Sequence, residues 1–298
     1  GESLHKAIDE FNQAVAKDPN FALGYAGLAD TYAVLSYYAD VPPQESFPLG
    51  LKAARRAIEI DPSLAEPHAA LAWIKGVYEW DWAGSEREFR EAIRLNPDWP
   101  TAHAWFGLIL TGRGRYQEGR QQTSEALRLA PHSPLMNALH GLTLYLAHDF
   151  EATERQLKVA LDLEPNYAFA RELYGGAMFQ QGRVADAIAE LREASRLGGG
   201  TAALKGGLGR ACAMGGERAE AEKILEELKQ LATTNLAVGH YIAVIYMGLG
   251  DKPQAMEWLE KGIAAKAYRA FQLKVDPAFD GLHSEERFQR LLKQIGLD

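Results

Sequence analysis

A proline recurs at nearly constant distance along most of this 298-residue chain. It stands at Pro19, Pro62, Pro97, Pro131 and Pro165, each time after a stretch with the apolar spacing of a helix. The successive distances are 43, 35, 34 and 34 residues. A period of 34 with a proline just past a helix is typical of a stacked helix hairpin. The first two intervals therefore contain nine extra residues and one extra residue.

Other positions of the repeat support this interpretation independently. With the proline at position 32, positions 20, 24 and 27 are small, large and small, as in Ser85, Phe89 and Ala92. Small residues let the two helices of a hairpin approach, and large residues fill the space between them. Beyond Pro165 the proline is lost, but units that start at residues 168, 202 and 236 keep the interval of 34.

The repeat count predicts the domain organisation. We expect one all-α solenoid domain over residues 1–298, with a half repeat at 1–21 and seven full units at 22–269. The extra residues of the first unit place an insertion near 36–48. Residues 270–298 are expected to form an extended segment and a terminal capping helix. Because a half repeat cannot bury its apolar face alone, we expect the chain to be part of a larger protein.

The units resemble the tetratricopeptide repeat (TPR) superfamily. They are similar to the C-terminal TPR region of multidomain bacterial signalling and transcription-regulator proteins. Three phrases carry this likeness: residues 24–32 with the insertion that follows, residues 78–84, and Leu273-Lys274-Val275-Asp276-Pro277. The resemblance implies a right-handed superhelix in which the first helix of each unit lines a concave groove. It also implies that peptides or partner proteins bind in that groove.

The groove-facing positions of the units carry apolar and aromatic side chains. A concave stripe of this kind is a candidate site for a peptide or helix, although the same residues could simply pack against neighbouring helices. Both interpretations stay open at this point. The candidate partner-binding residues are Trp73, Trp105, Leu108, Leu142, Tyr145, Phe179, Arg210, His240 and Met247.

Two aromatic features allow the same two interpretations. Trp80 and Trp82 flank Asp81 at a hairpin turn that holds the single extra residue. The insertion contains Tyr37, Phe47 and three prolines, which is unlike a polar loop. Each feature could be a binding element or could pack over the helices.

The leading functional prediction is a non-catalytic protein–protein interaction scaffold. It would bind a peptide or partner protein in its groove, as the regulatory or sensor part of a larger bacterial protein. The alternative is a structural or self-association arm, whose groove docks its own polypeptide or a second copy of the chain.

Other classes of function are disfavoured by the residues. The single cysteine, Cys212, occupies a core position, and His68 and His103 lack a third ligand, so we expect no catalytic, metal or cofactor site. With 32 basic and 40 acidic residues the net charge is −8, which argues against nucleic acid as a partner. No apolar run reaches the ~18–20 residues of a membrane span, so no membrane insertion is expected. The low cysteine content fits a cytoplasmic protein, and the periplasm stays open.

Overall fold

The computed structural model describes residues 2–298, and within that range the regular structure is helical. Successive helices pair as antiparallel hairpins. Helix α1 (Glu2–Lys17) precedes the first pair. The seven pairs are α2 (Ala22–Tyr38) with α3 (Pro43–Ile60), α4 (Ala65–Ile74) with α5 (Trp82–Leu95), α6 (Pro100–Gly112) with α7 (Tyr116–Leu129), α8 (Pro134–Leu146) with α9 (Phe150–Leu163), α10 (Ala168–Gln180) with α11 (Val184–Leu197), α12 (Ala202–Met214) with α13 (Arg218–Ala232), and α14 (Gly239–Leu249) with α15 (Lys252–Ala264). The predicted TPR solenoid of a half repeat and seven pairs is confirmed.

The first helix of each pair forms an inner layer and the second an outer layer. Helix α6 has ten buried residues among 13, whereas α7 has three among 14. An inner helix is enclosed on several sides and is apolar all round, while an outer helix turns one polar face to water. The small-large-small pattern lies between the layers, where Phe89 and Ala92 are fully buried. Among residues 2–298, no helix has both the length and the apolar character to cross a membrane.

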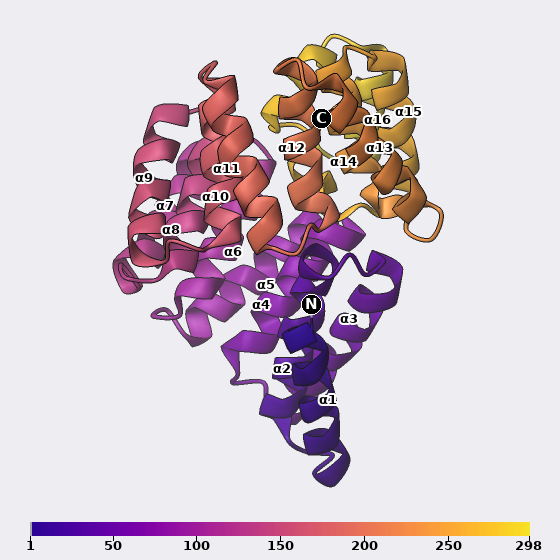
Figure 1. Ribbon diagram of the computed structural model, residues 1–298. Helices are drawn as coiled ribbons and strands as arrows, with labels where there is room; N and C mark the ends of the chain where they lie inside the picture. Colours follow the sequence, from indigo (N-terminus) through magenta and orange to yellow (C-terminus); the bar gives the residue numbers. More distant parts are fainter. Residues whose placement is uncertain (1) are drawn as a thin grey trace.

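The solenoid curls until its first unit reaches its sixth and seventh. In Figure 1 the pairs run from α1 at the bottom, through α6–α11 on the left, to α12–α16 at the upper right. The Asp40 carboxylate, in the loop after α2, accepts a hydrogen bond of 3.0 Å from the Ala202 N–H at the start of α12. The Asn235 side chain donates to the Asp40 carbonyl at 2.8 Å. These contacts close the inner layer around a narrow central groove.

The insertion of the first unit lengthens helices rather than a loop. Helices α2 and α3 have 17 and 18 residues, against 13 and 14 in the pair α6 and α7. Only residues 39–42 remain outside a helix, and Pro48 lies inside α3. Phe47 is fully buried. The extra turns carry Tyr37 to the groove and Asp40 to the contact that closes it.

The single extra residue of the second unit is absorbed by a π-helical turn. Segment η1 (Lys75–Glu79) continues α4 with the wider π-helical pattern, which accommodates one added residue without breaking the helix. Trp80 then adopts the left-handed conformation, with φ of 60°. Its ring lies 3.6 Å from the Lys266 ammonium, whereas the Trp82 Nε1–H donates to the Ile295 carbonyl at 2.8 Å. The two tryptophans therefore pack against different segments of the chain.

After α15 the chain turns back across the inner layer. This return contains the 3₁₀ segments η3 (Tyr268–Gln272) and η4 (Pro277–Leu282), and it leads to the final helix α16 (Glu286–Gln294). Helix α16 buries Phe288, Leu291 and Leu292 on one face, in agreement with the sequence pattern. Segment η2 (Leu236–Val238) precedes α14. We refer to residues 267–282, which contain η3 and η4, as the strap.

Candidate binding groove

The nine predicted groove residues lie on the inner helices α4, α6, α8, α10, α12 and α14. Four of them are buried: Trp73 and Leu108 are each 2% exposed, Leu142 is 6% and His240 is 3%. The other five, Trp105, Tyr145, Phe179, Arg210 and Met247, are half-buried. The repeat arithmetic thus identified a shared inner face. That face is largely covered in the structure, and the strap is what covers it.

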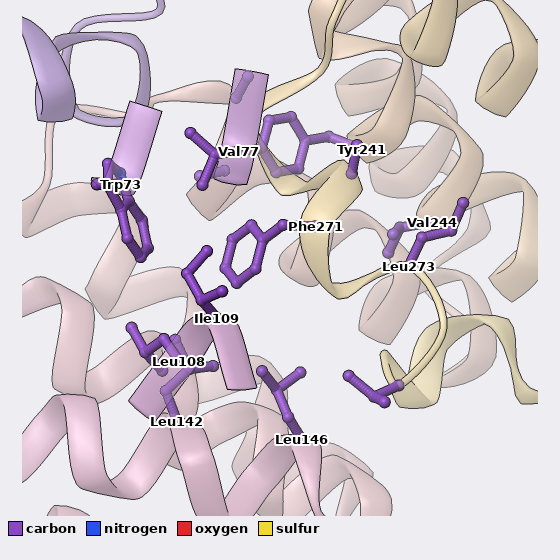
Figure 2. Packing of buried hydrophobic residues seen from close by; sticks show 14 of the residues in the cluster. Trp73, Val77, Leu108, Ile109, Leu142, Leu146, Tyr241, Val244, Phe271 and Leu273 are labelled. Carbon is purple, nitrogen blue, oxygen red and sulfur yellow. The ribbon is translucent and has the colours of Figure 1, made fainter. Parts of the chain in front are cut away.

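The strap inserts apolar side chains between the inner helices. Phe271 is 2% exposed, and Leu273 and Phe279 are fully buried. Figure 2 shows Phe271 directed from the strap toward Trp73, Val77 and Ile109 of the inner layer. The rings of Phe271 and Trp73 are 5.5 Å apart, edge to face. The strap is therefore part of the core of the closed solenoid.

A glycine of α6 allows the strap backbone to come close. A Cβ atom built on Gly112 would lie 2.4 Å from the Phe271 carbonyl oxygen, a distance that no real Cβ tolerates against backbone. Any other residue at this position would push the strap away from α6. The requirement for glycine is thus set by the strap and not by the helix hairpin.

A buried ion pair holds the centre of the strap. The Arg269 guanidinium donates to Glu172 of α10 at 2.9 Å, and the two side chains are 12% and 9% exposed. The Tyr37 hydroxyl donates to the other oxygen of Glu172 at 2.8 Å. Burial by itself would lower the pKa of Arg269, but the neighbouring Glu172 raises it well above its usual value. The guanidinium stays charged, and its charge is compensated inside the groove.

The second half of the strap is held by polar contacts to α8 and α14. Asp276 is the N-cap of η4 and accepts a hydrogen bond of 2.9 Å from the Ala278 N–H. Its other carboxylate oxygen lies 3.4 Å from His240 Nε2. Burial lowers the pKa of His240, so this imidazole is neutral at pH 7 and can donate to the carboxylate. His148, at the end of α8, approaches the Val275 carbonyl at 3.3 Å.

Two larger hollows border the strap. The first, which we call the aromatic pocket, has a volume of about 240 Å³ and includes Trp73, Trp105, Leu108 and Leu142. The second, which we call the polar hollow, measures about 80 Å³ and includes Tyr145, Phe179, Arg210 and His240. Eight of the nine predicted residues therefore line these two spaces. The ninth, Met247, lies beside Gly281 of η4.

The polar hollow is nearly balanced in charge. Arg269, Glu172 and Asp276 all reach its wall. The Arg210 guanidinium packs over the Phe179 ring at 4.9 Å, and its buried Nε has no hydrogen-bond partner among the described residues. Burial raises the pKa of the Tyr145 hydroxyl to about 12, so that group is neutral. The hollow can hold waters or a small polar group. Its two arginines are already engaged, Arg269 by Glu172 and Arg210 by the Phe179 ring.

The residues that could have carried other chemistry are engaged in packing. His68 Nδ1 pairs with Glu88 at 2.7 Å, and His103 bonds to Gln122 and to the Pro97 carbonyl. Cys212 is fully buried, and burial raises the pKa of its thiol to about 11. Within residues 2–298, no three His, Cys, Asp or Glu side chains gather where they could hold a metal ion.

One groove residue that sequence reasoning passed over is Asp30 of α2, at position 9 of the first unit. Its Oδ1 is buried and has no hydrogen-bond partner in the described part of the chain. Burial, reinforced by the charge of Glu66 on α4, raises the pKa of Asp30 from 3.8 to about 8. The side chain is therefore mostly protonated at pH 7. A buried acid of this kind costs stability at the position it occupies.

The Asp30→Asn variant should be more stable than the wild type above pH 4. The unfolded wild type releases a proton near pH 4, whereas the folded protein keeps it until about pH 8. Wild-type stability therefore falls with rising pH over this window, by at most about 1.4 kcal/mol per pH unit from this group. Urea unfolding of both proteins at pH 4, 6 and 8 measures the difference. A difference that is the same at all three pH values would contradict the buried-acid assignment.

The Arg269–Glu172 pair should behave as a coupled unit. Arg269→Met leaves a buried carboxylate without its cation, and we expect a loss of about 3–5 kcal/mol in the free energy of unfolding. The double variant Arg269→Met, Glu172→Gln should recover part of that loss, because no uncompensated charge remains. Denaturant unfolding of the two single variants, the double variant and the wild type gives the coupling energy. Strictly additive losses would mean that the two side chains do not interact.

Comparison with known proteins agrees with the fold described above. A sequence profile described as tetratricopeptide repeat matches residues 77–134, 139–202 and 180–235, which together exceed half of the chain. No curated protein matches the sequence.

Several solved structures share the architecture at low sequence identity. The human IFIT1 dimer with PPP-AAAA aligns with a TM-score of 0.63 at 16% identity, over 89% of this chain and 69% of its own. A chain of the APC/C hetero-tetramer Cut9–Hcn1 aligns with a TM-score of 0.56 at 17% identity, over 98% of this chain and 59% of that one. Pseudomonas aeruginosa PilF aligns over 72% of this chain and 96% of its own, at 22% identity and a TM-score of 0.49. At these identities the likeness concerns the fold alone. The profile match over more than half of the chain, together with the repeat period, leads to one conclusion: the chain belongs to the tetratricopeptide repeat family.

Proposed function

We propose that this chain is a non-catalytic protein-interaction scaffold whose groove is occupied by its own strap. The observation that carries the proposal is the docking of Phe271 and Arg269 between the inner helices, with Arg269 paired to Glu172. A groove that already holds a folded segment of the same chain works as an internal docking site. The proposal therefore favours the self-docking alternative over an open groove that awaits a partner.

The energetics of the strap support this choice. Phe271, Leu273, Val275 and Phe279 are all at most 2% exposed. Burying a side chain of this size contributes about 1.5–3 kcal/mol, so the four together contribute roughly 6–12 kcal/mol. A peptide that took the place of the strap would have to replace most of that free energy. It would also compete with a segment held at high effective concentration by its tether.

We propose a protein rather than a nucleic acid as the partner of the exposed surface. Binding a phosphate backbone requires several cations that are free to release counterions. In the groove, Arg269 is paired with Glu172, and the Asp276 carboxylate lies on the wall of the same hollow as Arg210. The net charge of −8 acts in the same direction. In a larger bacterial signalling protein, a closed and rigid arm of this kind would serve as a regulatory or sensor module.

The proposal is tested by adding the strap sequence as a separate peptide. A fluorescein-labelled peptide of residues 266–283 should not bind the wild-type chain, because the tethered strap fills the groove. It should bind the variant Phe271→Asp, Leu273→Asp, in which the tethered strap is weakened and the inner helices are unchanged. Fluorescence anisotropy measures both affinities.

A control places a single new aspartate on the outer layer. Val159→Asp, at a residue of α9 that is 45% exposed, should exclude the peptide as the wild type does. Circular dichroism establishes that all three proteins are folded. Equal binding of the peptide to the wild type and to the double variant would favour the open groove, and with it the peptide-binding scaffold.

A further inference from the structure

The aromatic pocket is a space that neither the repeats nor the strap fills. Its walls come from five inner helices and from the strap, and its volume is about 240 Å³. An engineered apolar cavity of about 150 Å³ is known to hold benzene. A space larger by more than half has room for a two-ring aromatic molecule.

The lining of the pocket is unusually aromatic. Trp73 and Trp105 lie 5.3 Å apart, and Tyr37 contacts both Phe169 and Tyr268 at less than 6 Å between ring centroids. Rings in such tilted and edge-to-face arrangements offer both faces and edges to a further aromatic ring. The seven aromatic residues of the wall are Tyr37, Tyr38, Trp73, Trp105, Phe169, Tyr268 and Phe271.

The charges around the pocket select an uncharged occupant. Arg269 is the one charged residue of the lining, and Glu172 already neutralises it. Its guanidinium also lies 5.4 Å from the Tyr37 ring centroid, in the position that a cationic ligand of an aromatic cage would take. A cationic ligand would lose its hydration without finding a free carboxylate, because Glu172 is already paired with Arg269, and an anion would have to break that pair. Both charged classes of ligand are therefore disfavoured.

The pocket has an opening on the surface. Leu135, at the start of α8, is 36% exposed, and Tyr38, at the end of α2, is 39% exposed. Both residues line the pocket, as does Thr101 at the start of α6. These three residues come from different helices and mark the rim through which a small molecule can enter while the strap stays docked.

From these observations we infer that the aromatic pocket is a binding site for a small, uncharged, two-ring aromatic molecule. The molecule would stack among Trp73, Trp105 and Phe271 and would contact the strap directly. Because the strap provides one wall, an occupant would stabilise the closed arrangement. A small molecule bound at this site would thus control whether the regulatory arm is closed.

The inference is tested in the full chain with 5-fluoroindole as the probe and ¹⁹F NMR as the readout, which avoids interference from the protein's own tryptophans. We expect saturable one-to-one binding to the wild type. Leu135→Trp should block the rim and weaken binding by at least about tenfold, which corresponds to about 1.4 kcal/mol. Thr101→Trp blocks the same rim from α6 and serves as a second variant if the first does not fold.

The matched control is Leu163→Trp, because Leu163 is 41% exposed on the outer helix α9 and lines neither hollow. It should bind the probe as the wild type does. The cationic analogue 5-fluorotryptamine should bind the wild type at least about tenfold more weakly than 5-fluoroindole. Absence of saturable binding, or equal binding to the wild type and to the folded rim variants, would overturn the inference.

Discussion

The closed form of this solenoid depends on one buried ion pair between segments almost 100 residues apart in the sequence. Arg269 enters the centre of the groove and meets Glu172 of α10, which also accepts the Tyr37 hydroxyl of α2. Three parts of the chain, namely the first unit, the fifth unit and the strap, are therefore fixed to one another at a single point. A charge pair in such a place is weak as a source of net stability, because both groups lose their water. The pair does fix where the strap docks, because any other register of the strap would leave one of the two charges buried without its partner.

Around this point the apolar contacts supply the stabilisation. Phe271 packs against Trp73, and the last residues of the strap pack against α14, where the rings of His240 and Phe279 are 5.1 Å apart. An ordinary repeat array gains stability from neighbouring units alone. Here the strap and the Asp40 contacts add links between distant units, so we expect the array to unfold more cooperatively than an open solenoid. The groove that repeat proteins commonly use for partners has become largely an interior, and two hollows border the segment that fills it.

The repeat period made much of the fold predictable, because small and large residues at fixed positions encode the packing of each hairpin. It also predicted which residues share the inner face: eight of the nine candidates line the two hollows. What it could not predict is that residues 267–282 lie on that face. The strap forms short 3₁₀ turns without a helical period, and its partners Glu172 and Tyr37 are distant in sequence, so no local pattern connects them. The alternation of Phe271, Leu273 and Val275 was the available sign that this segment is buried. Likewise, the repeat spacing predicted where extra residues are inserted but not which structure they adopt. Longer helices in the first unit and a π-helical turn in the second accommodate extra residues just as a loop would.

The most direct test of the account is amide hydrogen exchange of the strap in the intact chain. The strap amides make only local bonds, such as those from Ala270 to the Ala267 carbonyl and from Phe279 to the Asp276 carbonyl, and isolated turns of this kind exchange rapidly. If the strap is docked as described, the amides of residues 270–279 should exchange as slowly as those of the inner helix α8. Exchange of these amides at the rate of an unstructured peptide, with α8 still protected, would mean that the strap does not dock and that the groove is open in solution.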